Sequence, residues 1–151
     1  MNDALGHQLA VNDLVMFPVT GGQLLLGFIE SFSLRNGWNN IQYETVTIKY
    51  VKIRVKYDYG QNVAADTRYT YKPTLLSKKI TVQANQDNYY AHNRRMIKIE
   101  ECMLAPDAHR VQVGGYAQNV TDEAKQVYMA DALRKFEEAR RKCQEKAIET
   151  A

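Results

Sequence analysis

The chain is poor in the residues that cross-link proteins or anchor them in membranes. Its 151 residues include only two cysteines, Cys102 and Cys143, without CxxC spacing, so we expect two reduced thiols. No apolar run approaches the roughly 20 residues of a membrane-spanning helix, which predicts that there is no membrane partner. Residues 1–7 lack the basic and apolar regions of a signal peptide. Together these absences predict a cytoplasmic protein.

Signatures of catalysis and of cofactor binding are also missing. His7, His92 and His109 are isolated in the sequence and show no metal-binding spacing such as HExxH. The chain contains no GxSxG nucleophile elbow, no GxxxxGK[ST] phosphate loop and no GxGxxG after a strand. We therefore expect no metal, no cofactor and no enzymatic activity.

The chain does have an uneven distribution of charge. Its 20 Lys and Arg against 17 Asp and Glu give a net charge of only +3. Residues 44–100 nevertheless hold eleven Lys and Arg against five acids, whereas residues 1–43 hold one Arg against three acids. Segregated positive charge predicts an anionic partner better than the total charge does.

One long segment, residues 43–57, alternates between apolar and polar side chains as a β-strand does. The alternation changes phase halfway, because Tyr50 and Val51 are both apolar. An extra residue in a strand would restore one apolar face, so the phase change predicts a β-bulge near Tyr50-Val51. With that bulge, the opposite face would be a basic row made by Lys49, Lys52, Arg54 and Lys56.

The remaining patterns predict a mainly β domain over residues 1–105, a linker over 106–120 and a helix over 121–149. A short strand over 67–72 would end at Pro73, inside an inserted loop region. Gly27 indicates a bulge or a close backbone approach. The other strands are predicted at 11–19, 24–32, 79–83 and 96–100, with a polar loop at 84–95 and an edge strand near Val111 and Val113.

The C-terminal segment is predicted to begin as a helix at Thr121, a capping residue followed by acids. One narrow apolar stripe then repeats at spacings of three and four. Such a helix could dock on the β domain, pair with another copy or project into solvent. The stripe is formed by Tyr128, Ala132, Phe136, Ala139, Cys143 and Ala147.

Residues 11–29, VNDLVMFPVTGGQLLLGFI, resemble the opening of SH3-like barrels of the KOW type. Those barrels have a Gly-Asp-x-Val-like entry, a Gly turn and a Gly-x-Ile in the second strand. Asn12-Asp13-x-Val15 and Gly27-Phe28-Ile29 match, with Asn12 in place of the usual Gly. The resemblance covers about the first 30 residues and, by strand count, extends loosely to residue 104. It implies a five-stranded barrel that binds nucleic acid or protein, and it carries over no catalytic residue.

The arrangement also resembles small early proteins of tailed phages that bind DNA or act on host transcription. That resemblance implies a role in modulating transcription and a location in the cytoplasm of the host cell.

Basic residues interleaved with tyrosines suggest a nucleic-acid-binding surface, because cations contact phosphates and aromatic rings stack on bases. We expect DNA to be favoured over RNA, with little sequence specificity, because no basic recognition helix is visible. The alternatives are a module that binds a host or phage protein through the barrel and helix 121–149, an assembly component, and a merely solvated strand face. The predicted site comprises Lys49, Lys52, Arg54, Lys56, Tyr57, Tyr59, Arg68, Lys72, Lys78, Lys79, Arg94 and Arg95.

Overall fold

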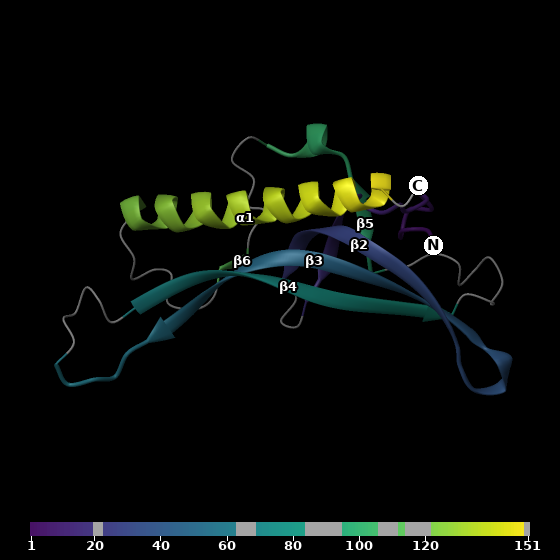
Figure 1. Ribbon diagram of the computed structural model, residues 1–151, viewed down its shortest axis with the longest axis horizontal. Helices are drawn as coiled ribbons and strands as arrows, with labels where there is room; N and C mark the ends of the chain where they lie inside the picture. The colour runs from purple at the N-terminus through teal and green to yellow at the C-terminus, as the bar shows by residue number, and fades with distance from the viewer. Residues whose placement is uncertain (20–22, 63–68, 84–94, 106–111, 114–121, 150–151) are drawn as a thin grey trace.

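The fold consists of one antiparallel sheet with a long helix lying across it (Figure 1). The computed structural model describes residues 1–19, 23–62, 69–83, 95–105, 112–113 and 122–149. The strands are β1 (Leu14–Pro18), β2 (Leu24–Asn36), β3 (Gln42–Tyr57), β4 (Tyr69–Gln83), β5 (Ile97–Ile99) and β6 (Gln112–Val113). The helix is α1 (Asp122–Glu149), and η1 (Trp38–Asn40) and η3 (Glu101–Met103) are short 3-10 turns.

The strand order is β4-β3-β2-β1-β5, all antiparallel, with β6 added in parallel to β3. The prediction of a mainly β protein followed by a C-terminal helix is confirmed. Among the described strands β4 and β5 are the two ends of the path, so the sheet is open.

Two apolar clusters lie on opposite faces of this sheet. The first contains Val15, Phe17 and Ile29 and is covered by the N-terminal residues Leu9 and Met1. The second is covered by α1 and contains these buried residues: Leu14, Leu26, Phe28, Val51, Ile53, Ala132 and Phe136.

β3 contributes to both clusters, and this explains the phase change in its sequence. Val46 and Ile48 belong to the first cluster, and Val51 and Ile53 belong to the second. The predicted bulge near Tyr50-Val51 is wrong, because β3 pairs with β4 without interruption from Tyr43 to Tyr57. β3 keeps its regular pleat. The segment that packs on it changes along its length, from the N-terminal residues on one face to α1 on the other.

A bulge does occur, but in β2. The register between β2 and β3 shifts between Ile29 and Ser31, which leaves Glu30 without a directly opposite residue. Gly27 precedes it, and the close approach predicted there is confirmed. A Cβ at Gly27 would lie 2.6 Å from Ile48 Cγ2 and 2.7 Å from the Lys49 carbonyl oxygen.

β4 is one strand of 15 residues that runs through Pro73. The prediction that Pro73 ends a short strand is therefore wrong. β4 is an edge strand, and the Pro73 carbonyl accepts a hydrogen bond from Lys135 Nζ at 3.2 Å, so it faces away from β3. Since a residue's N and O lie on the same side of a strand, the missing N–H costs no bond between β3 and β4.

The helix docks on the sheet through its predicted stripe. Ala132 and Phe136 are buried, and the Phe136 ring meets Phe28 edge-on with centroids 5.5 Å apart. Nearer the start of α1, the Tyr128 ring lies 4.8 Å from that of Tyr71 on β4. Of the three arrangements considered for this helix, the structure has the docked one.

The N-terminal segment is fixed by Asp3, a fully buried carboxylate. It accepts hydrogen bonds from the backbone N–H groups of Leu5, His7 and Lys98, at 3.0, 2.7 and 2.8 Å. Burial acts to raise the pKa of Asp3, but these donors outweigh it and hold that pKa below its usual value of 3.8. The carboxylate thus ties the first turn of the chain to β5.

Candidate nucleic-acid interface

Five basic side chains share the face of β3 and β4 that points away from α1. Three of them occupy alternate positions of β3 after Tyr50, so they lie on the same face as Val46 and Ile48. The other two are on β4, where one lies opposite Arg54 and the other opposite Ile48. We call this set the basic strip; it comprises Lys52, Arg54, Lys56, Lys72 and Lys78.

The strip is dense in charge. Residues two apart on a strand are about 6.6 Å apart, so Lys52, Arg54 and Lys56 form an evenly spaced row. Lys72 lies directly opposite Arg54, in a position where two like charges destabilise a strand pair. The fold therefore carries an unfavourable cation pair at the centre of this face.

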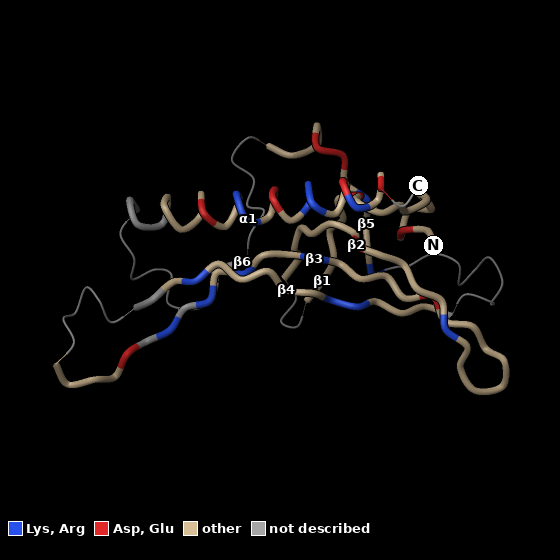
Figure 2. Tube along the Cα trace, viewed as in Figure 1, with Lys and Arg blue, Asp and Glu red and all other residues tan. Residues whose placement is uncertain are grey.

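The strip lacks compensating acids. Residues 45–57 and 69–81 hold seven Lys and Arg and no Asp or Glu. None of the five strip side chains forms an ion pair or hydrogen bond with a described residue. By contrast Lys98, Arg140 and Lys142 pair with Asp13, Glu101 and Glu138. Figure 2 shows the resulting run of basic residues on β3 and β4 below the helix.

Two of the predicted cations lie on the other face. Lys79 is opposite Thr47, and Lys49 is opposite Ser77, both on the face that carries Val51 and Ile53. The Lys49 ammonium pairs with Glu30 at 3.4 Å. Without a bulge in β3, Lys49 cannot join the row of Lys52, Arg54 and Lys56, so the predicted surface is smaller than expected.

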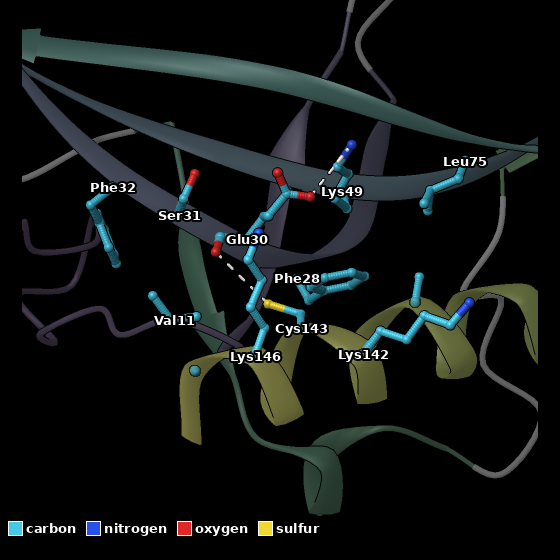
Figure 3. Close-up of a pocket in the computed structure, with 12 residues that line it drawn as sticks. Val11, Phe28, Glu30, Ser31, Phe32, Lys49, Leu75, Lys142, Cys143 and Lys146 are labelled. Atoms are coloured by element: carbon cyan, nitrogen blue, oxygen red, sulfur yellow. Dashed lines mark hydrogen bonds and ion pairs between the residues drawn. The ribbon is translucent and has the colours of Figure 1, made fainter. Parts of the chain in front are cut away.

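Lys49 instead lines a cleft of about 710 Å³ between the second half of α1 and the sheet (Figure 3). Its wall includes Phe28, Glu30 and Cys143. The Cys143 thiol faces the backbone carbonyls of Ile29 and Glu30 at the β2 bulge, 3.7 and 3.8 Å away. Burial, and then the charge of Glu30, raise the pKa of Cys143, so this thiol is a poor nucleophile at neutral pH.

The other predicted residues lie at the end of the β3–β4 pair, just before β5, or outside the described part. Tyr57 ends β3 opposite Tyr69, and Tyr59 beyond it is 83% exposed. Arg95 is exposed just before β5. Arg68 and Arg94 lie outside the described residues.

The sequence did not reveal that Lys72 and Lys78 belong to one strand with a common face. Pro73 interrupts the pattern of β4 and divided it into two predicted pieces. The available signal was the even spacing of Lys72, Thr74, Leu76 and Lys78, which places all four on one face of an extended chain.

Metal-binding chemistry has no site in the described part of the chain, where His, Cys, Asp and Glu form no cluster of three or more; His92 and His109 lie outside it. No described helix combines the length and hydropathy needed to cross a membrane. Comparison with protein-family models, with curated proteins and with solved structures finds no significant match for this chain.

Proposed function

We propose that the protein binds nucleic acid through the basic strip, with DNA as the favoured partner and with little sequence specificity. The observation that carries this proposal is that Arg54 and Lys72 lie directly opposite each other, in strand segments 45–57 and 69–81 that contain no acid. A polyanion laid along the strip would relieve this repulsion, because each phosphate contact neutralises a cation and releases counterions.

The shape of the sheet also supports this function. In Figure 1, β3 and β4 arch beneath α1, and both ends of the arch bend away from the helix. The strip therefore lies on the concave side of the arch, where an elongated ligand can touch several of its cations at once.

The proposal includes an SH3-like, KOW-type barrel as the type of fold. It also includes a role in modulating transcription, as in small phage proteins. Two backbone features support the barrel type. Asn12, in place of the family's usual Gly, has a left-handed φ of 74°, a conformation that Gly and Asn tolerate best. Gly27, in the family's second-strand position, has no room for a side chain.

The alternative of a protein partner held by the C-terminal helix has less support. Its stripe is already used within the chain, because Ala132 is 0% exposed and Phe136 is 1% exposed. A partner would have to bind the polar outer face of α1 or displace the helix from the sheet.

The test is charge reversal on one face with a matched reversal on the other. Lys52, Arg54 and Lys56 changed together to Glu should abolish binding to a labelled DNA in a gel-shift or anisotropy assay. Changing Lys49 and Lys79 to Glu should leave most of the affinity, because these residues lie on the helix side. Equal losses in both variants, or no binding by the unmodified protein at low salt, would refute the proposal.

A further inference from the structure

The hairpin between β2 and β3 holds the only tryptophan of the chain out in solvent. Trp38 is 85% exposed, although large aromatic side chains usually lie inside. The turn around it is well fixed. The Gly37 N–H donates to the Ile41 carbonyl at 2.6 Å, and the Ile41 N–H donates to the Trp38 carbonyl at 3.3 Å. Trp38 is therefore presented by an ordered turn.

The backbone of the turn suits its sequence. Asn39 and Asn40 both have left-handed backbones, with φ of 59° and 60°, a conformation that Asn tolerates better than other residues with a Cβ. Gly37 packs so closely on the Tyr43 ring that a side chain there would overlap it. The Arg35 guanidinium lies over the same ring, 5.3 Å from its centroid. Backbone and neighbouring side chains therefore fix the shape of the turn that carries Trp38.

The chemistry around Trp38 fits a nucleobase better than an apolar protein pocket. Residues 31–43 contain one cation, Arg35, and no acid. The exposed neighbours of Trp38 include the amides of Asn36, Asn39 and Asn40, which can pair with the hydrogen-bonding edges of bases. An indole ring stacks on bases of any sequence, which agrees with a surface that has little specificity.

We propose that Trp38 stacks on an unpaired base of the nucleic acid that the basic strip holds. This inference rests on the proposed function and specifies its partner as single-stranded or locally unpaired nucleic acid. Lys52, Arg54, Lys56 and Lys72 lie toward the end of β3 that is far from the hairpin carrying Trp38. Both ends of the arch bend to the same side (Figure 1). β3 has 16 residues and so spans about 50 Å. An oligonucleotide of about 20 residues is long enough to reach both.

The test uses the tryptophan fluorescence of the full chain, excited selectively so that the ten tyrosines do not contribute, and it therefore reports on Trp38 alone. Titration with a single-stranded oligonucleotide of about 20 residues should quench this fluorescence with the same midpoint as the anisotropy of a labelled oligonucleotide. A fully paired duplex of equal length should quench less. Trp38→Ala should weaken binding to the single strand about tenfold or more, and Trp38→Phe should retain most of the affinity.

Leu34→Ala is the matched control, because Leu34 is 60% exposed on the same hairpin but has no ring to stack. It should bind like the unmodified protein, and thermal melting should show that all three variants fold. Binding without quenching, or equal quenching by the duplex, would overturn this inference and leave the proposed function standing. Absence of any binding at low salt would overturn both.

Discussion

Ile48 and Val51 are three residues apart on β3 and are buried on opposite faces of the sheet, with 0% and 1% of their surfaces exposed. Each belongs to a different apolar cluster, so one strand forms a wall of both. A shift of β3 by one residue would turn both side chains out of their clusters, and the register is therefore strongly fixed. This fixed register keeps Lys52, Arg54 and Lys56 on the face away from the helix.

Gly27→Ala is expected to destabilise the fold by about 1–3 kcal/mol, because the new methyl group would overfill a packed site. The added Cβ would lie 2.6 Å from Ile48 Cγ2 and 2.9 Å from Phe17 Cε1. Urea unfolding measures the loss. Gly60→Ala at an exposed position is the control and should change stability by less than about 0.5 kcal/mol. Similar values for the two variants would contradict the close approach at Gly27.

Lys78 and Lys79 are neighbours in sequence on opposite faces of β4, and they provide a matched pair for the salt dependence of DNA binding. Five phosphate contacts predict a slope of log K against log salt of about −4.5 for a duplex. Lys78→Ala should make that slope shallower by about 0.9, since one phosphate contact is lost. Lys79→Ala should leave the slope unchanged. If Lys79→Ala has the larger effect, the binding face has been assigned to the wrong side.

Asp3→Asn is expected to cost about 1–3 kcal/mol at neutral pH, because buried N–H donors lose acceptors. The pKa of Asp3 in the folded protein lies below its usual 3.8, so its carboxylate stabilises the fold above that pH. This contribution is lost as the pH falls through the lower, folded-state pKa. The stability gap between the two proteins should therefore narrow at acidic pH. Unfolding curves at several pH values measure it, and a gap that widens in acid would be inconsistent with the assignment.

Cys102 and Cys143 should differ in their reactivity toward an alkylating reagent at neutral pH. Cys102 is exposed, whereas the pKa of Cys143 is raised by burial and by Glu30, so less of its thiolate is present. Mass spectrometry over time should show Cys102 modified well before Cys143. Raising the pH should increase the rate at Cys143. Equal rates at neutral pH would argue that the helix does not cover this thiol as described.

Local patterns predicted the segments with one consistent period. The helix follows from its stripe, which includes Tyr128 and Phe136, and β5 follows from the alternation around Ile97 and Ile99. Neither segment changes its period along its length, so the period is sufficient to place the element.

The candidate surface could not be predicted to the same extent. A phase change in a strand has the same sequence pattern in two cases. Either the strand has a bulge, or its two halves pack against apolar clusters on opposite faces of the sheet. Which of these holds at Tyr50-Val51 depends on distant residues, Leu9 on one side and Phe136 on the other. Pro73 is a similar case, because tolerance of proline depends on whether the strand lies at the edge of the sheet.

The outer edge of β4 has a further consequence for how copies of this chain behave together. Among the described strands none lies beyond β4, and a strand edge of 15 residues is a template for a second copy, whereas Pro73 with Lys72, Lys78 and Lys79 opposes such pairing. Two of these lysines belong to the basic strip, so their charge also serves to keep molecules apart. A bound polyanion would neutralise that repulsion, and copies crowded on one strand would then be freer to meet edge to edge. The density of protein on a nucleic acid and the self-association of the protein would then depend on the same lysine charges.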